Sequence, residues 1–178
     1  MEQHITKARQ MVSAAIFAAV LAVLSQIVLP IGPVPFNLAV LGAYLSGCLM
    51  PPIWAVSSVG VYLLMGLIGI PVFAGFSGGP AVFFGPTGGY LAGYLFIALC
   101  TSFAVHRSGK ISRIFPAMIA GLAICYLLGT GWFMLVTGSR LGESLMLCVV
   151  PFILPDLCKA VVALILTRSV KARMSHRT

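Results

Sequence analysis

The chain is built from long apolar runs that are separated by prolines, glycines and clustered basic residues. A membrane-spanning helix needs about 20 residues, and several of these runs approach or reach that length. The runs are continuous, whereas a membrane β-barrel would show alternating segments of about ten residues. With 60% hydrophobic and 8% charged residues, a soluble fold of 178 residues would have too few polar side chains to cover its surface. The sequence therefore predicts an all-α integral membrane protein.

The breaks between the runs predict a six-helix transmembrane bundle in a single domain that covers residues 1–178. Prolines in segment 30–35 and at positions 51 and 52 predict tight connections between antiparallel helices. The apolar segment 142–150 is cut off by Pro151, so we expect a short interfacial helix there. The six spans are expected at about residues 11–29, 36–50, 53–70, 88–105, 114–136 and 155–168.

Basic residues gather on one side of this six-span topology. The side that carries both termini holds nine of them, namely Lys7, Arg9, Arg107, Lys110, Arg113, Arg168, Lys171, Arg173 and Arg177. The opposite side holds Arg140 alone. This positive-inside pattern predicts a multi-pass protein of the cell membrane (inner or plasma membrane) with both termini in the cytoplasm. The net charge of +8 is thus an orientation and lipid-headgroup signal, and the basic residues form no stripe suited to nucleic acid.

A Gly/Pro-rich segment, residues 71–87, separates the third and fourth spans. Its glycines and prolines exclude a regular helix, yet the segment is apolar. Irregular backbone at membrane depth is tolerated where it is buried in protein or lines a cavity. We therefore expect a lid loop on the outer side, with a hydrophobic hairpin that plugs the bundle as the alternative. The candidate ligand contacts in and beside it are Gly75, Ser77, Gly78, Thr87 and Gly88.

Asp156 and Lys159 place two ionisable side chains in an apolar run. Charges at membrane depth are costly and by default mark a functional site. Pro155 occupies a position typical of the first turn of a helix, so we expect a broken helix whose new N-terminus points into a cavity. The spacing of three residues places the pair on one helix face. Asp156 could accept from a ligand N–H while Lys159 donates to a ligand oxygen; alternatively, the two neutralise each other as an ion pair.

Aromatic and amide side chains near the outer ends of the expected helices extend this candidate site. Tyr126 and Trp132 lie on the fifth span with glycines between them, which leaves room to stack on a flat ligand. Tyr90, with Tyr94 one turn later, is a similar candidate. Anchoring at the membrane interface is the alternative for these aromatic residues. Asn37 could supply an amide contact or could cap the second helix.

Small residues form a stripe on the first expected helix. Ala14, Ala18 and Ala22 recur every four residues, and Ala15 and Ala19 lie alongside. Such stripes let helices approach closely. The stripe is a candidate docking face for a partner membrane protein, with packing inside the bundle as the alternative.

The sequence also lacks the signatures of several enzyme classes. It contains no GxxxxGK[ST] phosphate loop, no GxSxG and no HExxH. Its three acidic residues are too few for a carboxylate-held Mg²⁺ centre, and its five cysteines form no CxxC or Cys/His ligand spacing. We therefore expect no enzyme activity, no cofactor and no metal site.

Four stretches resemble one family, the biotin-specific BioY proteins, which are substrate-capture (S) components of energy-coupling-factor (ECF) transporters. The matching stretches are 33–36 (PVPF), 62–75 (YLLMGLIGIPVFAG), 85–90 (GPTGGY) and 151–159 (PFILPDLCK). The resemblance extends over most of the chain, and the 62–75 stretch is its most specific part. One departure is Asn37-Leu38-Ala39, where the family usually has Thr-Leu-Gln, so a glutamine amide is missing at Ala39.

The resemblance implies six helices, an outward pocket for biotin closed by the loop after the third helix, and Asp156 and Lys159 as ligand contacts. It also implies that the alanine stripe docks on a T component and that ATP-binding-cassette ATPases supply the energy, which agrees with the missing phosphate loop. Biotin would be the transported ligand rather than a cofactor. The alternatives are an S-component-like protein for another small vitamin and a non-transporting membrane scaffold or assembly subunit.

Overall fold

The computed structural model describes residues 2–29 and 36–175. The chain runs through α1 (Glu2–Ser25), β1 (Val28–Leu29), β2 (Phe36–Asn37), α2 (Ala39–Leu49), α3 (Pro52–Leu67), α4 (Pro80–Phe83), α5 (Gly88–Ser108), α6 (Ile111–Thr137), α7 (Leu141–Cys148) and α8 (Val150–Ser175). The two short strands pair antiparallel, with Val28 opposite Asn37. The expected proline break at 30–35 lies outside the described residues.

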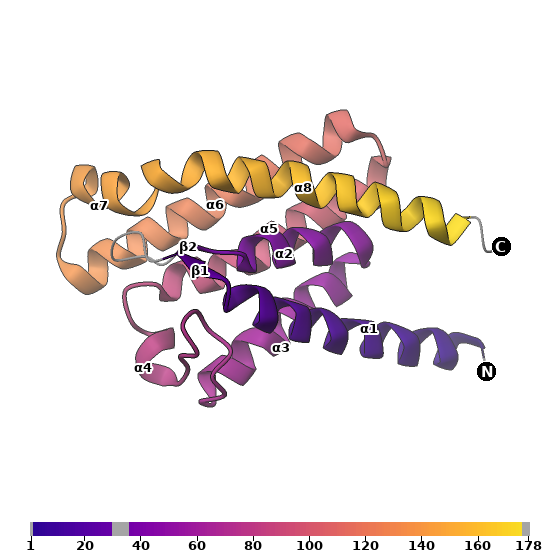
Figure 1. The fold of residues 1–178 in the computed structure, drawn as a ribbon, viewed down its shortest axis with the longest axis horizontal. Helices are drawn as coiled ribbons and strands as arrows, with labels where there is room; N and C mark the ends of the chain where they lie inside the picture. Colours follow the sequence, from indigo (N-terminus) through magenta and orange to yellow (C-terminus); the bar gives the residue numbers. More distant parts are fainter. Residues whose placement is uncertain (1, 30–35, 176–178) are drawn as a thin grey trace.

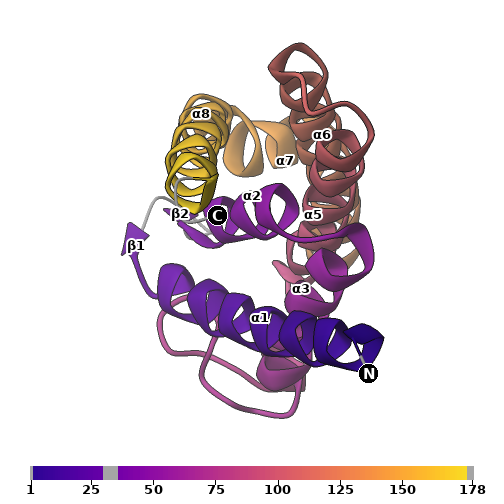
Figure 2. The ribbon, with the colours of Figure 1, turned by 90° about the vertical axis from the view of Figure 1, so that its right-hand side faces the viewer.

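The helices form one bundle whose two ends differ. Figure 1 shows both termini at one end, together with the connections from α2 to α3 and from α5 to α6. The paired strands, α4 and α7 lie at the opposite end. Figure 2, the view turned by 90°, places α2 in the interior, with α8, α5 and α1 around it. Most of the α2 residues are accordingly buried.

Four of the described helices are long and apolar enough to cross a membrane: α1 from Lys7, α5, α6, and α8 as far as Val170. The helices α2 and α3 are apolar but shorter. The 11 residues of α2 correspond to about 16 Å of helix, roughly half of a hydrocarbon core about 30 Å thick. The helix is short because the preceding residues, Phe36 and Asn37, are extended in β2.

Several helix boundaries differ from those expected from the sequence. The first helix begins at Glu2 because the polar segment before the apolar run is rich in good helix formers, and it ends at Ser25 because residues 28–29 pair with β2. The last helix begins at Val150 rather than at Pro155. Pro151 takes the second helical position, where a missing N–H costs nothing. Pro155, four residues later, leaves only the Pro151 carbonyl without its helical donor, so the helix continues through it.

The closest helix pair is α5 and α6, which approach through positions without side chains. Gly121 on α6 lies against Ile97 on α5. Gly129 on α6 lies against the ring of Tyr90, and a Cβ at Gly129 would overlap that ring. This close approach keeps Tyr90 flat against α6 near the end of the bundle that carries the paired strands.

The alanine stripe of α1 divides between two faces. Ala14 and Ala18 are 5% and 1% exposed and belong to the core of the bundle, and Ala22 is half-buried against it. Ala14 and Ala18 thus pack inside the bundle, which is the alternative that the sequence left open for the stripe. Ala15 and Ala19 are exposed.

Candidate functional site

Asp156 and Lys159 lie one turn apart on α8 and form a buried ion pair. Their exposed fractions are 3% and 6%, and Lys159 Nζ lies 2.6 Å from Asp156 Oδ1. Lys159 also donates to the backbone carbonyl of Asn37 at 2.6 Å. Its ammonium group lies 4.0 Å from the centre of the Phe36 ring, an arrangement that stabilises a cation. The strand β2 thus supplies two of the contacts that hold the lysine.

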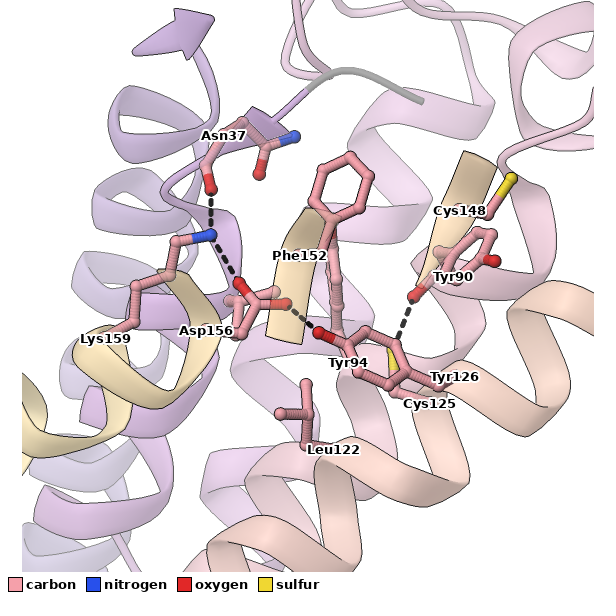
Figure 3. A pocket seen from close by; sticks show the side chains of 11 residues that line it. Asn37, Tyr90, Tyr94, Leu122, Cys125, Tyr126, Cys148, Phe152, Asp156 and Lys159 are labelled. Carbon is pink, nitrogen blue, oxygen red and sulfur yellow. Dashed lines mark hydrogen bonds and ion pairs between the residues drawn. The ribbon is translucent and has the colours of Figure 1, made fainter. Parts of the chain in front are cut away.

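The second carboxylate oxygen of Asp156 is held from another helix. The hydroxyl of Tyr126, on α6, donates to Asp156 Oδ2 at 2.7 Å. Figure 3 shows the resulting chain of interactions, which runs from Asn37 through Lys159 and Asp156 to Tyr126. A buried ion pair gains little net stability, because its attraction must offset the desolvation of both charges. These further contacts are what make the buried charges tolerable.

The pair borders a small cavity of about 40 Å³. Figure 3 shows Asp156 and Lys159 on one side of it and Tyr126, Tyr90 and Cys148 on the other. The complete lining is Asn37, Val40, Tyr90, Tyr94, Leu122, Cys125, Tyr126, Cys148, Phe152, Asp156 and Lys159. The cavity combines one charged wall with aromatic and aliphatic walls, as ligand sites commonly do. Its volume is well below the roughly 300 Å³ at which ligand pockets begin, so ligand entry requires the walls to move.

A second cavity, of about 130 Å³, lies between the first one and the Gly/Pro-rich loop. It shares Asn37, Tyr90 and Tyr94 with the first cavity. The remaining lining residues are Phe73, Ala74, Ser77, Val82, Thr87 and Leu91. The two cavities therefore meet at shared residues, with the ion pair at one end and the loop at the other.

The loop between α3 and α5 is more structured than the sequence suggested. It contains the one-turn helix α4, and an antiparallel bridge joins Phe73 to Ser77. Of the loop residues predicted to contact a ligand, Ser77 and Thr87 line the second cavity. The glycines are required by the course of the backbone. A Cβ at Gly78 would lie 2.5 Å from the Ile70 carbonyl oxygen. A Cβ at Gly88 would overlap the Phe83 carbonyl oxygen, and Gly75 has a φ of 71°.

The other predicted aromatic and amide residues divide in the same way. Tyr126, Tyr90 and Asn37 line the first cavity. Trp132 is not among the lining residues of either cavity, and its indole N–H donates to the Gly85 carbonyl at 2.9 Å. Trp132 therefore ties the end of the loop to α6.

Asn37 makes two kinds of contact, one through its side chain and one through its backbone. Its side-chain oxygen accepts from the Ala39 backbone N–H at 2.9 Å and so caps the first turn of α2. Its backbone carbonyl accepts from Lys159, and the residue lines both cavities. The cap therefore fixes the carbonyl that holds the lysine.

The apolar part of the lining was not predicted from the sequence. Leu122, Cys125, Cys148 and Phe152 look like any other apolar residues of a membrane helix. One signal was available, because Phe152 precedes Asp156 by four residues and therefore shares its helix face. Within the described residues, no group of three or more His, Cys, Asp or Glu side chains could hold a metal ion.

Comparison with known proteins gives consistent results for sequence and structure. The family model described as "BioY family" matches residues 1–176. A probable biotin transporter BioY of Pyrococcus horikoshii is 39% identical over 160 residues, which cover 90% of this chain and 94% of that protein. The biotin transporter BioY of Thermotoga maritima is 35% identical over 163 residues, with 92% and 96% covered.

Among solved structures, the S-component for biotin from an ECF-type ABC transporter matches with a TM-score of 0.84 at 28% identity. The match covers 94% of this chain and 93% of that one. The fold, the multi-pass apolar helices and the family model therefore agree, and the chain belongs to the BioY family of biotin transporter proteins.

Proposed function

We infer that the chain is the substrate-binding subunit of a biotin uptake system and captures biotin in the space between the ion pair and the loop. The observation that carries this inference is the buried Asp156–Lys159 pair at the edge of a cavity. Relatives named as biotin transporters and the matching biotin S-component support biotin as the ligand. The family is one of transporter components, so the chain is not an enzyme and biotin is its ligand rather than a cofactor.

The chemistry of biotin fits the polar groups at this site. Its ureido ring offers two N–H donors and a carbonyl, and its valerate tail ends in a carboxylate. Asp156 can accept from an N–H group, and Lys159 can donate to an oxygen. Each charge already has a second partner, Tyr126 for Asp156 and the Asn37 carbonyl for Lys159. A ligand that takes over part of the ion pair would thus leave neither charge unpaired.

The sizes of the cavities indicate how capture proceeds. The 40 Å³ cavity cannot hold biotin as it stands. It adjoins a larger space whose wall is the loop residues Phe73, Ala74 and Ser77. Movement of this loop would open and merge the two cavities. We infer that the loop is the lid of the site, and that the closed arrangement described above is its resting position.

The same reasoning gives a topology. The helices α1, α2, α3, α5, α6 and α8 are inferred to be the six spans, with α2 completed by the extended residues before it. The terminal end of the bundle carries the basic clusters that include Lys7, Arg107 and Lys110, and Arg140 lies at the other end. The positive-inside pattern then places both termini in the cytoplasm and the site on the outer side.

An ECF-type neighbour implies partners as well. The chain has no phosphate loop, so we infer that a T component and ATP-binding-cassette ATPases energise uptake. Ala15 and Ala19 are the exposed members of the alanine stripe and are the ones available to dock on the T component. Ala14 and Ala18 support this face from within the bundle.

Binding measurements with purified protein test this function. Titration calorimetry in detergent should show biotin binding by the wild type, and Asp156→Asn and Lys159→Ala should each weaken it at least about tenfold, or about 1.4 kcal/mol. The matched control is Glu143→Gln, which removes an exposed carboxylate from α7. Unchanged affinity in both site variants would reject the site, and preference for another vitamin over biotin would reject the ligand.

Uptake measurements test the partners separately. Cells that express the chain with a T component and its ATPases should accumulate labelled biotin faster than cells that express the chain alone. Replacing Ala15 and Ala19 by leucine should abolish that gain without changing biotin binding by the purified chain. Full acceleration in the leucine variant would place the docking surface elsewhere.

A further inference from the structure

Residues at the end of α1 hydrogen-bond to the loop between α3 and α5, the proposed lid of the site. Gln26, directly after α1, donates from Nε2 to the backbone carbonyls of Val72 at 3.0 Å and Phe73 at 3.1 Å. Its Oε1 accepts from the Phe76 backbone N–H at 2.8 Å. Ser25 is fully buried, and its hydroxyl also contacts the Val72 carbonyl. The Gln26 amide therefore hydrogen-bonds to two carbonyls and one N–H of a short hairpin that lies almost 50 residues away in the sequence.

The hairpin that Gln26 binds also forms one wall of the second cavity. Phe73 and Ser77 close it through their mutual backbone bonds, and both residues line the second cavity. The Phe73 side chain is 2% exposed and lies edge-on against Tyr62, with ring centres 5.5 Å apart. It fills a notch left by the missing side chain of Gly66, where a Cβ would overlap the ring. The position of the hairpin therefore decides whether the site is open or closed.

The ends of this segment are fixed on a different helix from its tip. Ile70 N–H donates to the Met65 carbonyl at 3.0 Å, and Gly79 N–H donates to the Gly66 carbonyl at 2.7 Å. Both acceptors belong to α3. Between these ends, Gln26 binds the backbone of the hairpin from the end of α1. If the hairpin lifts while its ends stay attached, the Gln26 hydrogen bonds break and the Phe73 ring leaves its place beside Gly66.

Two glycines at the attached ends of the hairpin are suited to such a movement. Gly69 and Gly79 have φ angles of 102° and 94°, and a Cβ at either would meet nothing within 4 Å. Glycine adopts such backbone angles freely, and open space allows the backbone to rotate there. Hinges of this kind absorb the backbone change when a lid opens. Two glycine hinges at the ends attached to α3, together with the side-chain contacts of Gln26, make up the parts of a lid with a latch.

We propose that Gln26, supported by Ser25, is the latch that holds the 69–79 hairpin closed over the site, and that it sets the rate at which biotin leaves. This proposal rests on the function inferred above. Breaking the latch exposes three backbone groups that water can satisfy once the tip has lifted, so opening is reversible. A glutamine suits this position because its amide offers donors and an acceptor together. Alanine offers neither, and glutamate offers acceptors alone.

Dissociation kinetics test the latch. With labelled biotin and a chase of unlabelled biotin, Gln26→Ala should raise the dissociation rate constant about tenfold, with an association rate constant equal to or above the wild-type value. A tenfold change corresponds to about 1.4 kcal/mol. Gln26→Glu should also release biotin faster, because it cannot donate to the two carbonyls. The matched control is Ser13→Ala on the same helix, whose hydroxyl bonds only to Arg9 of its own helix, and it should match the wild type.

Hydrogen exchange provides a readout that needs no ligand. In the protein without biotin, amides of residues 70–79 should exchange faster in Gln26→Ala than in the wild type, while amides of α5 and α6 stay unchanged. A merely destabilised variant would show faster exchange throughout the bundle. Equal exchange of residues 70–79 in both proteins would overturn the latch, as would an unchanged dissociation rate constant. A wild type that binds no biotin would reject the proposed function, and the exchange result would still decide whether Gln26 holds the hairpin.

Discussion

Two buried polar clusters lie toward opposite ends of this bundle and differ in kind. Toward the end that carries the paired strands, Asp156 and Lys159 carry opposite charges and border a cavity. Toward the terminal end, a serine seam formed by Ser46, Ser58 and Ser102 joins α2, α3 and α5. Ser46 and Ser58 bond to each other at 2.7 Å, and Ser102 donates to the Met50 carbonyl at 2.6 Å.

The contrast separates polar groups that hold helices together from polar groups that bind a ligand. Neutral hydroxyls that bond to backbone carbonyls cost little to bury and tie helices together at roughly 0.6 kcal/mol each in a membrane. A charged pair costs far more to desolvate and returns little net stability. We therefore explain its presence next to a cavity by the ligand proposed for this site, whereas packing alone explains the seam.

Removing one charge should produce the largest effect. Lys159→Ala leaves the buried Asp156 carboxylate without its cation, which should lower the free energy of unfolding by about 3–5 kcal/mol and weaken biotin binding. The double variant Asp156→Asn/Lys159→Met removes both charges and keeps an acceptor for Tyr126. It should recover most of the stability but not the binding, as measured by thermal unfolding and biotin titration. Wild-type affinity in the double variant would make the pair structural, like the seam.

Substitutions at two glycines should also distinguish the two ends of the bundle, because one should affect stability and the other ligand binding. A Cβ at Gly47 would lie 2.7 Å from both the Ala98 carbonyl oxygen and Thr101 Cβ, so Gly47→Ala should destabilise the bundle by about 2 kcal/mol through overpacking. A Cβ at Gly66 would instead displace the Phe73 ring, which belongs to the proposed lid. Gly66→Ala should therefore weaken biotin binding more than it lowers the unfolding temperature. Gly60→Ala is the matched control on α3, since nothing lies within 4 Å of its Cβ position.

The two ends also differ in how far the sequence could describe them. The charges of Asp156 and Lys159 stand out because nothing near them is polar, and their spacing of three residues fixes a shared face. The apolar walls, including Leu122 and Phe152, do not stand out because a side chain that faces a cavity and one that faces lipid have the same composition. Ala14 and Ala15 pose a similar problem, since adjacent small residues give no sign of which one is buried.

Backbone geometry was harder to predict than polarity. Pro155 was expected in the first turn of a helix, but the helix begins at Val150 and Pro151 takes the first-turn position, one turn earlier. Gln26 and the hairpin residues that it binds lie almost 50 residues apart in the sequence, so no local sequence pattern could predict their contact. Trp132, a candidate for stacking on a ligand, donates to the Gly85 carbonyl. Its partner lies in a loop whose course follows from tertiary contacts.

A substitution at Tyr126 tests whether the site needs the uncharged hydroxyl that donates to Asp156 as well as the two charges. Tyr126→Phe removes the 2.7 Å hydrogen bond to Asp156 Oδ2 and changes no charge. Hydrogen bonds to charged groups are worth about 1.5–3 kcal/mol, and the lower figure applies here because Lys159 still holds the carboxylate. We expect stability to fall by about 1.5 kcal/mol and biotin affinity to fall several-fold, by denaturation and titration. Full affinity in the variant would mean that the ligand itself orients Asp156.

The smallest effect is expected in the seam. Ser102→Ala removes the donor to the Met50 carbonyl where α2 meets α3. The His106 ring nitrogen that bonds near Ser102 also has the Ser102 backbone carbonyl as a partner at 3.0 Å, so it keeps a contact. Stability should fall by about 0.6–1 kcal/mol, with biotin affinity and its dissociation rate unchanged. A loss of affinity would show that movement at the terminal end reaches the site, which lies about three helical turns away along α5. The two polar clusters would then have to be treated as one coupled system.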